Sequence, residues 1–114
     1  MSERDDTVYL KHILDAIKKI KQYLKNINET SFIQNSLFQD AVIRQIEIIG
    51  EAARNISTQL IDEYPSVPWQ DVIGMRHKLI HDYFGVDIEA VWKTATEDVP
   101  ILEKQVRLIL KNFS

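Results

Sequence analysis

Residues that interrupt helices are scarce in this chain, and this scarcity constrains its fold more than any other feature. Among 114 residues there are only three glycines and three prolines: Gly50, Gly74, Gly85, Pro65, Pro68 and Pro100. Long stretches without either residue favour long helices. No stretch alternates apolar and polar residues with the two-residue period of a strand. We therefore predict an all-α chain.

Apolar residues at intervals of three and four predict a first long helix from about Asp5 to Asn28. They are Leu10, Ile13, Ile17, Ile20, Leu24 and Ile27. Such a helix would be roughly 36 Å long and would pack lengthwise on its neighbours. Its opposite face carries lysines, among them Lys11 and Lys18, which we expect to be solvated. A polar break follows at Asn28–Ser31.

A second helix is predicted from about Asn35 to Glu63, and it carries two apolar rows. The main row is Val42, Ile46, Ile49, Ala53, Ile56 and Leu60, and the row beside it is Leu37, Ala41, Ile48 and Ala52. Two rows require burial on more than one side, either at the centre of a bundle or at a subunit interface. Gly50 lies close to small alanines, so another helix could approach closely there.

Two further helices are expected after the proline-rich segment Tyr64–Pro68, which cannot itself be helical. One begins at Pro68 and ends at Gly85, which suits a left-handed cap. The other begins after Asp87 as its N-cap, and Pro100 predicts a kink near Thr96–Val99. We therefore expect one domain over residues 1–114, folded as an antiparallel bundle of four main helices with a kinked last helix.

Composition excludes several classes of function. The chain has no cysteine, which excludes disulfides, a thiolate nucleophile and cysteine-based metal sites. Seventeen acidic and 14 basic residues give a net charge of -3, so any binding of nucleic acid must depend on a local basic site. Apolar runs are too short to span a bilayer, and Met1–Asp6 is too acidic for a secretory signal. We expect a soluble, cytoplasmic protein without a membrane partner.

Ionisable residues gather in the segment Gly74–Gly85. Four cationic or titratable side chains fall within six residues: Arg76, His77, Lys78 and His81. Arg76 could hold a phosphate through two hydrogen bonds, and His81 could transfer a proton near neutral pH. In the alternative interpretation, Arg76 pairs with Asp82 and Tyr83 packs at the helix end.

Metal binding is a weaker interpretation of the histidines. His77 and His81 are four residues apart and share a helical face, but zinc proteases require a glutamate directly after the first histidine, where this chain has Lys78. We therefore predict no metal and no cofactor. His12 lies in the first predicted helix, where we expect a structural or surface role.

The spacing Arg76-x4-His81-x-Tyr83 fits the Arg-x(4–6)-His-x-Tyr signature of the HEPN superfamily of helical nucleotide-binding domains. The chain resembles the HepT-like branch, the toxin half of HepT/MNT toxin–antitoxin modules. The resemblance runs from about Asp6 to Leu110. The segments that carry it are Gln39–Ala53, Tyr64–Trp69, Gly74–Gly85, Val91–Trp92 and Glu97–Asp98.

The resemblance implies a metal-independent endoribonuclease that acts as a homodimer, with the motifs of both protomers facing one cleft. Arg76 and His81 take the catalytic positions. Tyr83 matches the tyrosine that accepts AMP from the antitoxin, a minimal nucleotidyltransferase, as in a type VII-like system. His77 and Lys78 lie outside the signature and are assigned electrostatic support for RNA binding.

Two other functions stay open at the level of sequence. The domain could be a non-catalytic partner of a nucleotidyltransferase that binds nucleotide or RNA, or it could be a structural interaction protein. On an ideal helix Arg76 and His81 would point about 140° apart. Either the helix is distorted before Gly85, or the two side chains meet across a dimer axis, which we favour.

Overall fold

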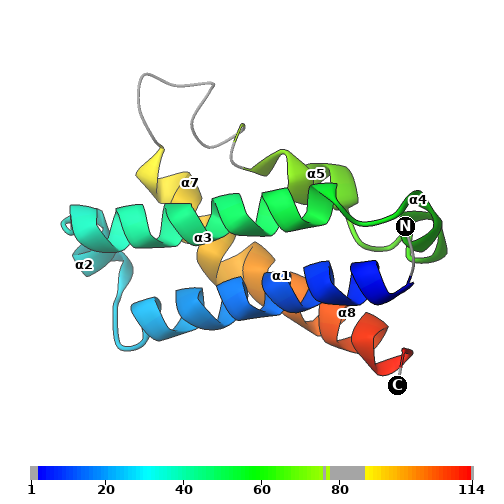
Figure 1. Cartoon of the computed structure of the whole chain (residues 1–114). Helices are drawn as coiled ribbons and strands as arrows, with labels where there is room; N and C mark the ends of the chain where they lie inside the picture. The colour runs from blue at the N-terminus through cyan, green and yellow to red at the C-terminus, as the bar shows by residue number, and fades with distance from the viewer. Residues whose placement is uncertain (1–2, 76, 78–86, 114) are drawn as a thin grey trace.

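The computed structural model describes residues 3–75, 77 and 87–113, and this part of the chain is helical without a strand (Figure 1). The prediction of an all-α fold is confirmed. The helices are α1 (Glu3–Leu24), α2 (Glu29–Ile33), α3 (Ser36–Arg54), α4 (Thr58–Glu63), α5 (Trp69–Ile73), α7 (Ile88–Lys93), the π-helical turn η1 (Thr94–Asp98) and α8 (Val99–Lys111).

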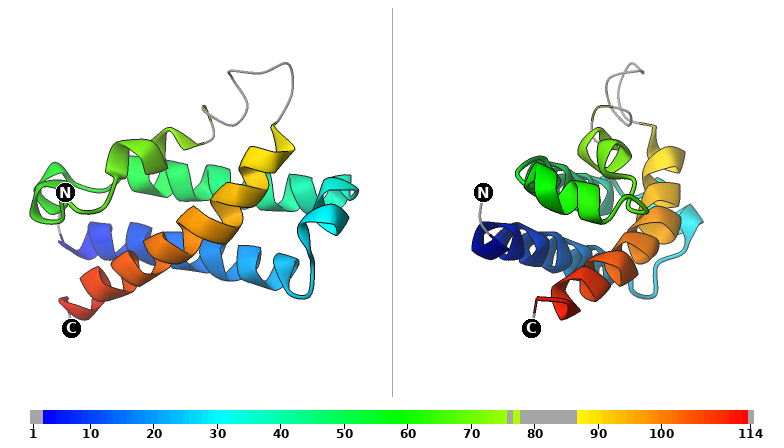
Figure 2. Two further views of the ribbon diagram at one scale, coloured as in Figure 1. Left: turned by 180° about the vertical axis from the view of Figure 1, so that it is seen from behind. Right: turned by 90° about the vertical axis from the view of Figure 1, so that its right-hand side faces the viewer.

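Three long helical segments form the body of the bundle. α1 and α3 lie side by side and run in opposite directions, and the continuous segment α7–η1–α8 crosses both of them (Figures 1 and 2). α5 packs on α3 at the side from which the chain leads toward residues 76–86. None of the described helices is long and apolar enough to cross a membrane.

The predicted apolar seams form the core. On α1, Leu10, Ile13, Ile17 and Ile20 are almost completely buried, whereas the lysines of the opposite face are exposed as expected. The main row of the second predicted helix is also buried, from Val42 to Leu60. Each such aliphatic side chain contributes about 1.5–3 kcal/mol when it is removed from water. This burial holds α1, α3 and α8 together.

The second row of α3 behaves differently. Ala52 is buried and Ala41 and Ile48 are half-buried, but Leu37 at the start of the helix is 76% exposed. The single chain therefore covers this row only in part.

Gly50 permits the close approach that the sequence suggests. A Cβ atom at this position would lie 3.2 Å from the carbonyl oxygen of Ile73 and 3.3 Å from that of Val72. The end of α5 therefore rests directly on the backbone of α3. Because Met75 follows α5 within two residues, this contact also positions the start of the segment that carries the motif.

Two predicted helix boundaries are wrong. The first helix ends at Leu24 instead of near Asn28, because Asn26 adopts a left-handed conformation with φ of 64°. The polar break predicted at Asn28–Ser31 is also wrong, because the non-helical residues are 25–28 and Glu29–Ile33 forms α2. Asn28 instead caps α2 by accepting a hydrogen bond from the Ser31 amide at 2.8 Å.

The start of the second predicted helix at the cap Asn35 is confirmed. The prediction of one continuous helix to Glu63 is wrong, because the chain leaves the helix between Arg54 and Thr58. The helix ends at Arg54, where the side chain of Asn55 donates to the carbonyl of Glu51 at 2.9 Å. Ser57 is extended and caps the separate helix α4 by accepting from the amide of Leu60 at 3.2 Å. Both polar side chains compete with helical hydrogen bonds, which is why they stop the helix.

The remaining boundaries agree better with the sequence. The third helix begins after Pro68 as predicted, but the chain turns at Gly74, so α5 is short, and the predicted continuation to Gly85 lies outside the described residues. The last helix begins at its cap Asp87, as expected. At the site of the predicted kink the chain forms η1, and Pro100 stands in the first turn of α8.

Two polar contacts tie distant elements together. The buried carboxylate of Asp6 accepts from the amide and the hydroxyl of Ser57, at 2.8 and 2.6 Å. Glu103 of α8 accepts from Lys21 of α1 at 3.2 Å and from Arg107 at 3.1 Å. Burial raises the pKa of Glu103, but the hydrogen bonds and charges of these two cations outweigh burial, and the pKa falls below its ordinary value.

Candidate functional site

The predicted motif lies mostly outside the part of the chain that the structure describes. This holds for Arg76, Lys78, His81 and Tyr83, so their roles remain predictions. His77 is described and is exposed on a helical stretch. The structure therefore bears on the site through the elements at the two ends of the motif segment.

The helix before the motif, α5, is packed into the bundle. Trp69 and Val72 of α5 are buried, and the indole Nε1 of Trp69 donates to the carbonyl of Tyr64 at 3.0 Å. The amide of Gly74 donates to the carbonyl of Gln70 at 2.9 Å and closes the helix. Met75, directly before Arg76, is thus attached to an element that is packed on α3.

The end after the motif is anchored in the same way. The carboxylate of Asp87 accepts from the amide of Ala90 at 3.1 Å and caps α7. Val91 is fully buried, and the ring of Trp92 lies against Phe32 with a centroid distance of 5.3 Å. The residues that follow the motif segment therefore begin a helix that is packed on the bundle.

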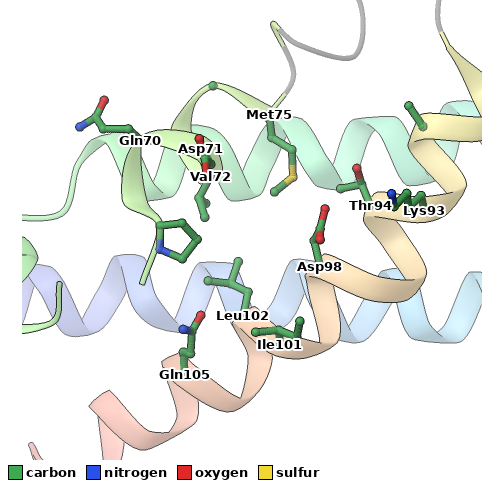
Figure 3. A pocket seen from close by; sticks show the side chains of 13 residues that line it. Gln70, Asp71, Val72, Met75, Lys93, Thr94, Asp98, Ile101, Leu102 and Gln105 are labelled. Carbon is green, nitrogen blue, oxygen red and sulfur yellow. The ribbon is translucent and has the colours of Figure 1, made fainter. Parts of the chain in front are cut away.

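A cavity of about 720 Å³ lies between these two anchors. Val72 and Met75 line it from the α5 side, and Thr94, Asp98 and Leu102 line it from η1 and α8 (Figure 3). Its size is within the range of small-molecule sites, about 300–1,000 Å³. The π-helical turn η1 forms part of its wall, and such turns occur frequently at functional sites.

Two acceptor groups stand in this mainly apolar cavity. The Asp98 carboxylate points from η1 toward α5 in Figure 3 and belongs to an exposed residue. Gln105 donates through Nε2 to the carbonyl of Ser66 at 3.2 Å, but its Oε1 atom is buried without a partner. Of the two acceptors, only the Oε1 atom of Gln105 is buried without a donor, which is energetically costly. Lys93 adds one cation to the lining.

The sequence analysis singled out neither Asp98 nor Gln105 as a site residue. Two sequence features could have drawn attention to Asp98. It lies in a segment that carries the family resemblance, and it is next to the predicted kink. Gln105 gave no signal, because an amide on an amphipathic helix is ordinarily a surface residue. Among the described residues, no group of three histidine, aspartate or glutamate side chains could hold a metal ion.

Comparison with known sequences identifies relatives over almost the whole chain. A family model described as "Ribonuclease HepT-like" matches residues 13–109. "Putative RNase MJ1380" of Methanocaldococcus jannaschii is 41% identical over 96% of this chain and 100% of the relative. "Probable ribonuclease HepT" of Thermococcus cleftensis is 40% identical over 96% of this chain and 99% of the relative. No solved structure matches the chain significantly.

Proposed function

Because the chain belongs to the HepT-like ribonuclease family, we propose that it is an endoribonuclease that cleaves RNA without a metal ion. The observation that carries this proposal is the extent of the family match. It spans residues 13–109 and so includes the whole motif from Arg76 to Tyr83. RNA contains its own nucleophile, so the protein needs to supply only proton transfer and stabilisation of charge.

In the proposed reaction, the 2′-hydroxyl attacks the adjacent phosphorus and the bond to the 5′-oxygen breaks. One basic group takes the proton of the 2′-hydroxyl, and one acidic group gives a proton to the leaving 5′-oxygen. His81 serves in this proton transfer, and Arg76 binds the phosphate and the charge that develops on it. The products are a 2′,3′-cyclic phosphate and a 5′-hydroxyl. His77 and Lys78 add positive charge for RNA.

We propose that the active form is a homodimer. One chain supplies a single motif histidine, whereas the reaction profits from an acid and a base, and a two-fold cleft would bring two copies together. Leu37 is exposed, and the second apolar row of α3 is only partly covered by the chain itself. Both observations support a contact between this face of α3 and a second copy of the chain. Light scattering at micromolar concentration should give twice the mass of the chain. A particle of 13.3 kDa would contradict the proposal.

We further propose that the enzyme is the toxin of a toxin–antitoxin pair and that AMP on Tyr83 inactivates it. The phenol oxygen would attack the α-phosphorus of ATP, with loss of its proton and of pyrophosphate, in the active site of a minimal nucleotidyltransferase. The added phosphodiester charge and adenosine would repel and block the incoming RNA backbone.

Intact-mass measurement tests the modification. The chain is incubated with the cognate nucleotidyltransferase, ATP and magnesium, and the mass of one or more AMP groups should be added to the wild type. Tyr83→Phe should gain no mass and should escape neutralisation, whereas Tyr9→Phe serves as the matched control. AMP on the Tyr83→Phe variant would assign the acceptor to another residue.

A gel assay tests the activity itself. Purified chain is incubated with total RNA in the presence of EDTA, and cleavage is expected. A mobility shift without cleavage would favour the non-catalytic partner domain, and neither result would favour a structural interaction protein. Arg76→Ala and His81→Ala should each lose roughly 10²–10⁴-fold in rate, as is usual for an acid–base group. His12→Ala, at an exposed position, is the control.

A further inference from the structure

One side of the α1–α3 pair is not covered by any described helix. In Figure 1 these two helices lie in front of the α7–η1–α8 segment, and the view from behind in Figure 2 shows that this segment crosses them on one side only. A groove of about 400 Å³ lies between α1 and α3. It is lined from α1 by Tyr9 and His12 and from α3 by residues between Arg44 and Asn55. This face therefore has room for a further contact.

The α3 residues of this face repeat at intervals of four and three. They are Leu37, Ala41, Arg44, Ile48, Glu51 and Asn55. Such spacing places side chains in one row along a helix, as in the seam between two helices that pack lengthwise. The apolar members of the row are only partly covered, since Leu37 is 76% exposed and Ala41 and Ile48 are half-buried. The row therefore suits another helix that covers these side chains and supplies charges opposite to those of Arg44 and Glu51.

The two charged residues of the row identify that helix as a second copy of α3. The side chains of Arg44 and Glu51 are 68% and 69% exposed. When two copies of α3 lie antiparallel, with a two-fold axis between residues 47 and 48, Arg44 of each copy faces Glu51 of the other. A two-fold contact forms this pair twice. In a parallel pair, by contrast, each charge would face its own copy and be repelled.

The ion pairs within the chain leave both charges available for this contact. The Arg44 guanidinium lies 4.0 Å from the Glu47 carboxylate, and that of Arg54 lies 3.8 Å from the Glu51 carboxylate. Both distances are at the limit of an ion pair, and exposed pairs of this kind contribute little to stability. A second copy can therefore add contacts to Arg44 and Glu51 without disrupting a strong interaction.

The exposed Leu37 fits the same arrangement. It lies about ten residues, or about 15 Å, before the proposed axis, so the partner's Leu37 lies about as far beyond it. That position is next to the end of the groove at Asn55. The half-buried ring of Tyr9 lines this groove and contacts His12 edge to face, with a centroid distance of 6.1 Å. It offers the apolar surface that Leu37 lacks within its own chain.

We propose that two copies of this chain associate through the α1–α3 groove, with antiparallel α3 helices, two Arg44–Glu51 pairs and Leu37 of each copy at the Asn55 end of the other groove. This inference rests on the proposed homodimer, for which it supplies the surface and the register. Because α5 rests on α3 at Gly50, the contact also fixes the two α5 helices, which lead to the two motifs, relative to each other.

Charge reversal tests the pairing. Light scattering over a range of concentrations gives the mass of the wild type, Arg44→Glu, Glu51→Arg and the variant with both changes, and circular dichroism checks that each is folded. Each single reversal places like charges against each other twice, and we expect it to weaken the dimer roughly 100-fold or more. The variant with both changes should be dimeric again. Lys104→Glu reverses an exposed charge of α8 outside the groove and, as the matched control, should stay dimeric.

A mixture of the two single variants gives a readout that a merely structural effect would not move. Arg44→Glu is acidic at both positions of the pair and Glu51→Arg is basic at both, so each associates poorly with itself and well with the other. An equimolar mixture should form a dimer with one chain of each kind. Single variants that dimerise like the wild type would overturn the pairing. So would a mixture, or a variant with both changes, that stays monomeric.

Single cysteines test the register, since the chain itself has none. Ile48 is next to the proposed axis, so a short bismaleimide should join two copies of Ile48→Cys. Two copies of Leu37→Cys would lie about 30 Å apart along the helices and should not be joined, although Leu37 is the more exposed residue. Cross-linking of Leu37→Cys, or its absence in a dimeric Ile48→Cys protein, would overturn the antiparallel register.

These results distinguish a failure of this inference from a failure of the proposed function. A wild-type dimer that both single reversals leave intact overturns this surface, and the homodimer and ribonuclease proposals stand. A monomeric wild type overturns the homodimer and this surface together. A dimer with the expected dependence on charge that does not cut RNA supports this surface and overturns the ribonuclease proposal alone.

Discussion

The buried contact between Asp6 and Ser57 allows a quantitative test of how the bundle is closed. The two residues are 51 positions apart, and their contact ties the first turn of α1 to the start of α4. Asp6 is only 3% exposed and accepts two hydrogen bonds, at 2.8 and 2.6 Å. Ser57 in turn caps α4 through its hydroxyl.

We expect Asp6→Ala to destabilise the protein by about 3 kcal/mol, since each hydrogen bond to a charged group contributes about 1.5–3 kcal/mol and the second is partly replaced by water. Ser57→Ala should cost about 2.5–4 kcal/mol, because it removes one hydrogen bond to the charged carboxylate, about 1.5–3 kcal/mol, and the N-cap of α4, about 1 kcal/mol. The loss of stability in the double variant should be smaller than the sum of the two single losses, by at least about 1 kcal/mol. The reason is that both changes remove the same contact.

Urea unfolding followed by circular dichroism, at one fixed protein concentration, measures all four free energies. Asp15→Ala, at an exposed position of the same helix, is the matched control and should change the stability by less than about 0.5 kcal/mol. A similar small effect for Asp6→Ala would refute the reasoning. Additive losses in the double variant would show that the two side chains do not act through one contact.

Two further substitutions test contacts that position the site and the last helix. Gly50→Leu should lower the free energy of unfolding by about 1–3 kcal/mol, since its side chain meets the backbone carbonyls of α5, and unchanged stability in urea would contradict that close approach. Glu103→Gln should cost up to about 1 kcal/mol at pH 7, because its cationic partners are largely exposed. The lowered pKa of Glu103 means that the wild-type advantage is present above its ordinary value of 4.5 and is lost as the pH falls through the lower folded value. An advantage that persists at pH 2 would contradict this assignment.

Local sequence patterns predicted the parts of the fold that depend on local periodicity. The seam of α1 and the main row of α3 are buried as their spacing indicates, and Asp87 caps α7. The break at Asn55–Ser57 was missed because Ile56 and Leu60 continue the apolar spacing across it. Both residues are buried, but they reach the core from a turn and a separate helix.

Part of the candidate site could also be predicted from local sequence, and part of it could not. The motif from Arg76 to Tyr83 is visible in the sequence because its residue types and spacing are unusual in an acidic chain. The cavity could not be predicted from the sequence, because it lies between α5 and the η1–α8 segment, which are distant in sequence. Asp98 and Gln105 lie seven residues apart on one continuous helical segment, but the cavity that both line forms only where α5 lies beside that segment.

The chemical form of the cleaved RNA tests the central claim most directly. An oligoribonucleotide that the wild type cuts is compared with one that carries a single 2′-deoxynucleotide at the cleavage position, both in EDTA. Attack by the 2′-hydroxyl predicts a 2′,3′-cyclic phosphate and a 5′-hydroxyl from the first, and no cleavage of the second at that position. A 5′-phosphate product, cleavage of the deoxy substrate, or loss of activity in EDTA would contradict the account.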